Sequence, residues 1–153
     1  MNRQARQLAL LAAAGSAALL GGAFLFQLAG YAPCKLCWWQ RWPHALAIIL
    51  GLIVWQTGRR GLAWAGALAA LATAGLGVYH TGVERGLWIG PATCSSSPVQ
   101  GLSTDDLMTQ IMNAPLVRCN EVAWSLFGLS MASWNAVLSL GLALLWVAAA
   151  RRR

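Results

Sequence analysis

Apolar residues gather in four long stretches of this 153-residue chain, and polar segments separate them. The stretches cover about residues 8–28, 38–56, 62–80 and 131–150. A helix needs about 20 predominantly apolar residues to cross the hydrocarbon core of a bilayer, and each stretch has roughly that length. The pattern therefore predicts four membrane-spanning helices.

We expect these helices to form one membrane domain over residues 1–153. Within a bilayer every backbone polar group must be satisfied internally, which favours helices. Small residues in the first and third stretches, among them Gly21, Gly22 and Gly66, let the helices approach closely. The predicted fold class is therefore all-α, an integral membrane four-helix bundle. Its two larger loops, at about residues 29–37 and 81–130, lie on the side opposite both termini.

The distribution of positive charge indicates which side is cytoplasmic. The net charge is +7, and basic residues without acidic neighbours collect at the N-terminus, at Arg59 and Arg60, and at the C-terminus. Loops rich in arginine and lysine face the cytoplasm. We therefore expect cytoplasmic termini and two periplasmic loops, and we expect no nucleic-acid partner. All the acidic residues fall on the periplasmic side: Glu84, Asp105, Asp106 and Glu121.

The first apolar stretch resembles a signal peptide in position but not in length. Its run of about twenty residues exceeds the 7 to 15 that are typical of a signal sequence, and no clear small-residue cleavage site follows it. We expect it to stay as the first span.

A short amphipathic helix is predicted within the second periplasmic loop. Ser103 and Asp106 have the spacing of a capping box, which marks a helix start. The helix either lies on the membrane surface or packs on the other loops. Its apolar residues gather on one face: Leu107, Met108, Ile111 and Met112.

The four cysteines divide between the two periplasmic loops, with Cys34 and Cys37 in the first and Cys94 and Cys119 in the second. Disulfides persist in the bacterial periplasm and similar oxidising spaces, so two bridges are permitted. A bridge across Cys-x-x-Cys closes a very small ring and stabilises a fold little. The same spacing at a helix N-terminus lowers the pKa of a thiol. The first pair therefore indicates redox chemistry.

Two ionisable residues accompany the first pair near the membrane surface. Arg41 shares a helix face with Cys37 at i,i+4 spacing, and a nearby cation favours the reactive thiolate. The alternative is an arginine that only extends its charge to the interface. His80, at the outer end of the third stretch, is a functional candidate because ionisable groups are costly at membrane depth. His44, one turn beyond Arg41, is a weaker candidate.

Other uses of the cysteines fit the spacing poorly. A four-thiolate zinc site usually has closely spaced pairs, whereas 24 residues separate Cys94 from Cys119. A c-type haem is excluded because Trp38, not histidine, follows Cys37. The segment around Cys94 is small and polar, so we expect Cys94 to be the exposed member of its pair, open to attack by an outside protein.

The chain resembles the DsbB family at several separate motifs. The similarity runs through all four stretches and both loops. The motifs are Cys-Lys-Leu-Cys-Trp-Trp-Gln-Arg at 34–41, Tyr79-His80-Thr81, Ala92-Thr93-Cys94, and Cys119 followed by Trp124, Gly128-Leu129, Met131 and Trp134.

The resemblance implies a multi-pass protein of the bacterial inner membrane that generates disulfides. Such a protein reoxidises a DsbA-like periplasmic thiol oxidase and passes the electrons to the membrane quinone pool, so the implied cofactor is a quinone, ubiquinone or menaquinone. No metal is implied. Two rivals remain: a quinone-linked enzyme of the vitamin K epoxide reductase type, whose motif is expected on a later span, and a non-enzymatic four-span protein with braced loops.

The resemblance also implies roles for particular residues. Cys34 and Cys37 correspond to the quinone-side pair, and Cys94 and Cys119 to the partner-facing pair, all four being catalytic. The resting connectivity stays open between these two pairs and an interloop bridge from Cys34 to Cys119. Gln40 stands where a relative has an acid. The implied quinone contacts are Arg41, His80 and Met131.

Overall fold

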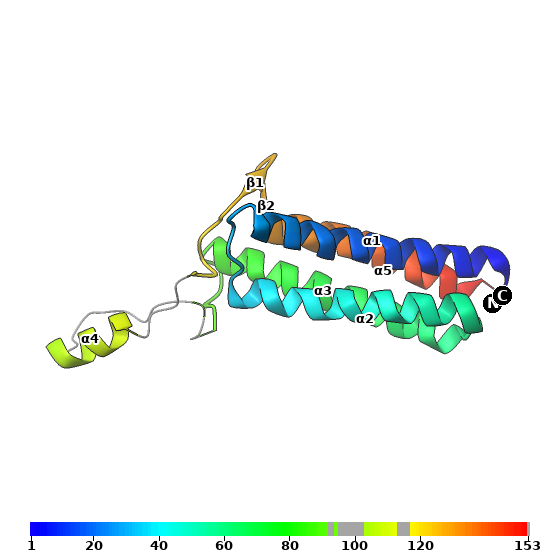
Figure 1. Cartoon of the computed structure of the whole chain (residues 1–153), viewed down its shortest axis with the longest axis horizontal. Helices are drawn as coiled ribbons and strands as arrows, with labels where there is room; N and C mark the ends of the chain where they lie inside the picture. Colours follow the sequence, from blue (N-terminus) through cyan, green and yellow to red (C-terminus); the bar gives the residue numbers. More distant parts are fainter. Residues whose placement is uncertain (92–93, 95–102, 113–116, 153) are drawn as a thin grey trace.

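A computed structural model of the chain consists mostly of helices that run side by side (Figure 1). It describes residues 1–91, residue 94, residues 103–112 and residues 117–152. The four long helices are α1 (Arg3–Leu28), α2 (Lys35–Thr57), α3 (Arg60–Glu84) and α5 (Met131–Arg151). Both termini lie at one end of the bundle (Figure 1).

Three of the long helices, α1, α3 and α5, are long and apolar enough to cross a membrane. The fourth, α2, is 23 residues long and has polar residues in its first turns, among them Lys35, Gln40 and Arg41. The mostly helical fold class is confirmed. The count of four spans and the cytoplasmic position of the termini stay predictions.

Two smaller features complete the described residues. The short helix α4 covers Thr104–Met112, as the capping signal predicts: the Ser103 hydroxyl donates to Asp106 Oδ2 at 2.6 Å and accepts from the Asp106 backbone N–H. Met108 and Met112 are exposed, whereas the side chains of Leu107 and Ile111 lie outside the described atoms. The strands β1 (Ser125–Leu126) and β2 (Leu129–Ser130) form an antiparallel pair that precedes α5 and that the sequence did not predict.

Small residues allow the long helices to approach closely. Gly77 of α3 faces Ala132 and Ala136 of α5, and a side chain at position 77 would clash with them. Gly66 of the same helix lies against the fully buried indole of Trp146. Lipid provides no hydrophobic force between helices, so close backbone packing of this kind is what holds a membrane bundle together.

The connection between α1 and α2 places the first cysteine at a helix start. Cys34 has extended backbone angles and is the N-cap of α2, its Sγ accepting a hydrogen bond from the Cys37 N–H at 3.2 Å. The helix ends at Gly58, whose φ of 63° suits glycine. The two sulfurs of the Cys-x-x-Cys motif therefore lie at the positive end of a helix dipole.

Candidate functional site

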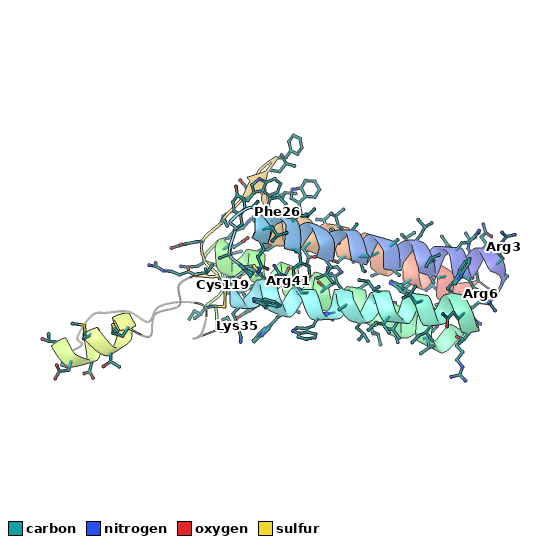
Figure 2. All side chains as sticks on the ribbon, in the orientation of Figure 1. Arg3, Arg6, Phe26, Lys35, Arg41 and Cys119 are labelled. Atoms are coloured by element: carbon teal, nitrogen blue, oxygen red, sulfur yellow. A yellow bond between two sulfur atoms is a disulfide. The ribbon has the colours of Figure 1, made fainter. Side chains whose placement is uncertain are left out.

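All four cysteines lie at the end of the bundle away from the termini. Cys94 and Cys119 form a disulfide, and Cys34 and Cys37 are free. Of the two connectivities left open by the sequence, the structure has neither in full: the Cys94–Cys119 bridge is formed, whereas Cys34 and Cys37 are bonded neither to each other nor to Cys119. Figure 2 shows Cys119 near Lys35 and Arg41, far from Arg3 and Arg6.

The expectation that Cys94 is exposed is wrong. Cys94 and Cys119 are both fully buried, in one cluster with Cys34, Leu36 and Val83. The Cys119 backbone N–H also donates to the Cys94 carbonyl at 2.9 Å, which holds the two segments together. The small polar residues around Cys94 favoured exposure, but the long-range contact with the start of α2 decides its burial.

The two sulfurs of the first pair lie close together, with Cys34 Sγ 2.8 Å from Cys37 Sγ. Both residues precede the predicted span at 38–56. The hydrogen bond from Cys34 lowers the pKa of Cys37 to about 7, against the opposing effect of burial, and the Arg41 charge contributes in the same direction as the hydrogen bond. Hydrogen bonding with Cys37, together with burial, raises the pKa of Cys34. In the reduced pair Cys37 is therefore the more acidic thiol and the first to lose its proton.

Arg41 is held inside the bundle. Its side chain is only 8% exposed, and its Nη1 donates to Gln27 Oε1 of α1 at 2.7 Å. The guanidinium also lies 4.7 Å from the ring centres of Phe24 and Trp38. These contacts favour a role inside the bundle over an arginine that only reaches toward the interface, and the action of Arg41 on Cys37 stays a prediction. Among the described residues, Arg41 Nε has no hydrogen-bond partner although it is buried, so it is available to a ligand.

His80 lies at the first cysteine of the motif rather than the second. Its ring is buried, with Nε2 3.5 Å from Cys34 Sγ and Nδ1 2.9 Å from Gln40 Nε2. Glu84 follows one turn later because α3 continues beyond the predicted span, and its Oε1 is 3.9 Å from His80 Nε2. The Ser130 hydroxyl donates to Glu84 Oε2.

A chain of polar side chains continues from His80 into the bundle. Asn135 of α5 donates through Nδ2 to Gln40 Oε1 at 2.7 Å, and its Oδ1 lies 2.9 Å from His44 Nε2. The sequence alone did not predict a role for Asn135 or Gln27. The available signal was the same for both: an amide side chain within an otherwise apolar stretch is costly in lipid unless it has a partner.

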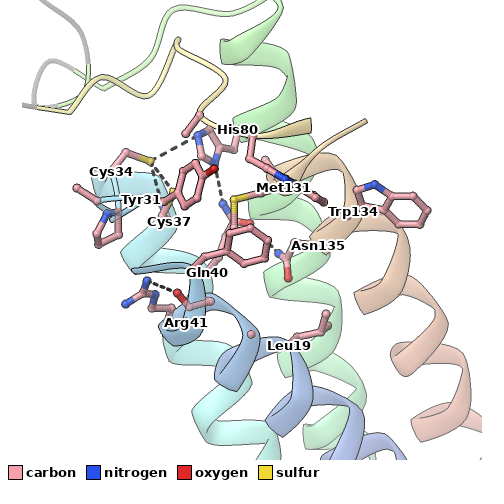
Figure 3. Close-up of a pocket in the computed structure, with 18 of the residues that line it drawn as sticks. Leu19, Tyr31, Cys34, Cys37, Gln40, Arg41, His80, Met131, Trp134 and Asn135 are labelled. Atoms are coloured by element: carbon pink, nitrogen blue, oxygen red, sulfur yellow. Dashed lines mark hydrogen bonds between the residues drawn. The ribbon is translucent and has the colours of Figure 1, made fainter. Parts of the chain in front are cut away.

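A cavity of about 260 Å³ lies beside the first cysteine pair (Figure 3). Its volume is near the lower end of the usual range for ligand pockets, about 300–1,000 Å³, and suits a ring-sized group. The structure brings together every residue expected at the quinone. The lining includes Cys34, Cys37, Arg41, His80 and Met131, with His44 and Asn135 beside them and apolar residues such as Leu19 and Phe26 from α1.

The residues that could bind a metal ion differ from the four-thiolate zinc site considered from the sequence. A site of four thiolates is not formed, because Cys94 and Cys119 are bonded to each other. Among the described residues, Cys34, Cys37 and His80 have ligand atoms within 4.8 Å of one another and could together hold a metal ion.

Comparison with known proteins agrees with this geometry. The family model described as disulfide bond formation protein DsbB matches residues 5–149. The chain belongs to the DsbB family. It is therefore a multi-pass protein of the bacterial inner membrane and a thiol oxidoreductase of disulfide-bond formation. The vitamin K epoxide reductase and non-enzymatic alternatives do not account for this membership.

Curated relatives span most of the chain. The chain is 33% identical to disulfide bond formation protein B 2 of Pseudomonas syringae pv. syringae over 150 residues, covering 92% of this chain and 85% of the relative. It is 29% identical to disulfide bond formation protein B of Albidiferax ferrireducens, covering 99% and 92%, and 31% identical to that of Marinobacter nauticus, covering 79% and 77%. No solved structure matches the chain significantly.

Proposed function

We propose that this DsbB-family protein reoxidises a periplasmic DsbA-type dithiol protein and passes the electrons to a membrane quinone, ubiquinone or menaquinone. One observation carries the proposal. Cys34 packs in the same buried cluster as the Cys94–Cys119 disulfide and also lines the cavity with Cys37. It is therefore the group through which electrons from the second loop reach the cavity.

The proposal includes the membrane topology. All of residues 1–153 form one membrane domain with four spans at about 8–28, 38–56, 62–80 and 131–150. The termini are cytoplasmic and the loops at about 29–37 and 81–130 are periplasmic. Arginines at both chain ends and at the α2–α3 connection support this orientation by the positive-inside rule. The cysteines then face the oxidising compartment.

Disulfide exchange conserves electrons at each step. The cycle starts with a disulfide between Cys34 and Cys37. A thiolate of the partner attacks Cys94, which forms a mixed disulfide and releases Cys119 as a thiolate. Cys119 then attacks Cys34, so a Cys34–Cys119 bond forms, the Cys34–Cys37 bond breaks and Cys37 receives the electron pair.

Regeneration of the second disulfide completes the exchange. The partner's other thiol displaces Cys94, and Cys94 attacks Cys119, which releases Cys34 as a thiolate. The partner leaves with a new disulfide. The two electrons now reside on Cys34 and Cys37 beside the cavity, and loss of these electrons restores their disulfide.

The cavity residues suit a quinone. When bound, a quinone supplies the chemistry that is missing, because it accepts two electrons and two protons. Arg41 Nε is buried and lacks a hydrogen-bond partner among the described residues, so it can donate to a carbonyl oxygen. Met131 and the apolar side chains of α1 supply contacts for a ring. The lowered pKa of Cys37 favours the thiolate of this residue, which is the reactive form, beside the cavity.

The test is the oxidation of a reduced DsbA-type protein by the purified protein in lipid nanodiscs with and without a short-chain ubiquinone. Beyond the partner oxidised by the protein's own disulfides, we expect partner thiols to be lost only when quinone is present, and Cys37→Ser to stop this repeated turnover. Lys35→Ala, a change at an exposed residue inside the same motif, is the matched control and keeps activity. Partner oxidation at an equal rate without quinone would contradict the proposal.

A further inference from the structure

Backbone carbonyls determine the orientation of the two amide side chains beside His80. Gln40 Nε2 lies 3.3 Å from the Leu36 carbonyl, and Asn135 Nδ2 lies 3.4 Å from the Thr73 carbonyl. A carbonyl oxygen only accepts hydrogen bonds, so the atom that faces it in each amide is the NH2 group. The same orientations allow Asn135 Nδ2 to donate to Gln40 Oε1 at 2.7 Å (Figure 3).

The orientation of Gln40 determines the protonation of His80. Gln40 Nε2, a donor, is 2.9 Å from His80 Nδ1. An amide NH2 group cannot accept a hydrogen bond, so Nδ1 must accept one and carries no proton. In the neutral imidazole the proton then lies on Nε2.

The proton on His80 Nε2 faces the first cysteine. Cys34 Sγ is 3.5 Å away, within hydrogen-bond range for sulfur, whereas Glu84 Oε1 is at 3.9 Å and the other Glu84 oxygen accepts from the Ser130 hydroxyl. The Cys119 backbone is a further acceptor beside the ring, but it carries no net charge. A thiolate accepts a hydrogen bond from an imidazole N–H. Cys34 is therefore the preferred partner whenever its sulfur carries negative charge.

We propose that Gln40 and Asn135 are positioning residues that fix His80 in its Nε2–H tautomer, so that His80 donates a hydrogen bond to the Cys34 thiolate. The step of the cycle at which Cys34 becomes a thiolate rests on the proposed function. Cys34 carries charge when Cys94 attacks Cys119: the Cys94–Cys119 bond forms, the Cys34–Cys119 bond breaks and the electron pair moves to Cys34. The hydrogen bond from His80 stabilises this leaving group.

The hydrogen bond between Asn135 and His44 has the same donor-to-acceptor direction as the bonds nearer to Cys34. Asn135 Oδ1, an acceptor, faces His44 Nε2 at 2.9 Å and accepts from the Ser139 hydroxyl at 3.3 Å. His44 therefore also carries its proton on Nε2. Every donor in the series from His44 to Cys34 then points at an acceptor, which makes the series one oriented unit.

A carboxylate at position 40 should reverse the tautomer. The carboxylate would accept a hydrogen bond from an Nδ1–H group instead of donating one to Nδ1. The proton would then be on Nδ1, and Nε2 would face the negative sulfur without a proton. Gln40→Glu is therefore the sharpest variant. Ser139→Ala is the matched control, because Ser139 contacts Asn135 but not Gln40 or His80.

Nuclear magnetic resonance of protein labelled with ¹⁵N-histidine tests the assignment directly. The chain has two histidines, so a His44→Asn variant identifies the signals of His80. We expect wild type and Ser139→Ala to show His80 as the neutral Nε2–H form and Gln40→Glu to move the proton to Nδ1. An Nδ1–H form or an imidazolium in wild type near neutral pH would overturn the proposal, as would an unchanged spectrum in Gln40→Glu.

Reactivity supplies a second readout. A variant with alanine at positions 37, 94 and 119 leaves Cys34 as the single thiol. Adding Gln40→Glu should slow its modification by a small methanethiosulfonate about tenfold, the loss expected for a hydrogen bond to a charged group. Equal rates would contradict the proposal. Absence of quinone reduction in wild type would overturn the proposed function without altering the histidine spectrum, so the two failures are distinguishable.

Discussion

Arg41 of α2 donates a hydrogen bond to Gln27 Oε1 of α1 at 2.7 Å, and this contact orients the cation beside Cys37. Without Gln27 the guanidinium would keep its contact with the Ala23 carbonyl at 3.3 Å and its two ring contacts. The hydrogen bond therefore positions the charge and is not needed to keep it buried.

Gln27→Leu should weaken quinone use without disturbing the fold. Loss of a hydrogen bond to a charged group costs about 1.5–3 kcal/mol, so we expect KM for quinone to rise roughly ten- to hundredfold with kcat less affected. Steady-state kinetics with varied quinone measure this. Gln7→Leu, at an exposed position of the same helix, is the control, and an equal effect of both changes would rule out positioning by Gln27.

Cys37→Ser should abolish quinone reduction and leave the Cys94–Cys119 disulfide able to exchange with the partner. Only the first pair lines the cavity, whereas the second is bonded behind Cys34. Stopped-flow absorbance of the quinone measures the first effect, and gel mobility of the thiol-labelled partner the second. Normal turnover would remove Cys37 from the mechanism.

Mixed with the oxidised partner, Cys119→Ser should form a covalent complex through Cys94. The free Cys94 thiolate attacks the partner's disulfide, so the Cys94–partner bond forms, the partner's own disulfide breaks and one partner cysteine leaves as a thiolate, while Cys119 is absent and cannot displace the partner. Non-reducing gels followed by peptide mapping identify the cysteine involved. Because Cys94 is buried, formation of the complex in wild type must include a local opening, and we expect the variant to form it faster. An adduct through Cys34 would reverse the assignment of the two pairs.

The alkylation rate of Cys37 in the reduced protein should rise with pH through about 7, because its pKa is lowered to that value and the thiolate is the reactive form. Arg41→Met removes an attraction that favours the thiolate, so the midpoint should move to higher pH. Lysine should restore it only in part, since a point charge does not reproduce the planar guanidinium. A midpoint unchanged in Arg41→Met would show that the arginine does not act on Cys37.

Hydrophobic length and capping signals were sufficient to predict the helices. The four long apolar stretches each became a long helix, and the Ser103–Asp106 spacing marked the start of α4. The length of α3 was underestimated because helix and apolar stretch do not end together: residues 81–84 are less apolar and still helical. That extra turn is what places Glu84 beside His80.

The motif spacing also predicted the first cysteine pair and Arg41 as neighbours, because they belong to one helix. Contacts between helices could not be predicted in this way. Gln27 and Asn135 lie 14 and 95 residues from their partners Arg41 and Gln40, and nothing local links them. The burial of Cys94 likewise depends on packing against Cys34, which local composition does not encode.

In the proposed function, electrons from the partner reach a quinone through Cys34 and Cys37. The most direct measurement is the stoichiometry of the complete reaction in nanodiscs, with quinol formed and partner disulfide formed counted in the same sample under anaerobic conditions. After the first turnover, we expect one quinol for each partner disulfide in wild type and no quinol in Cys37→Ser. Continued formation of partner disulfide in wild type without a matching amount of quinol would contradict electron transfer through Cys34 and Cys37.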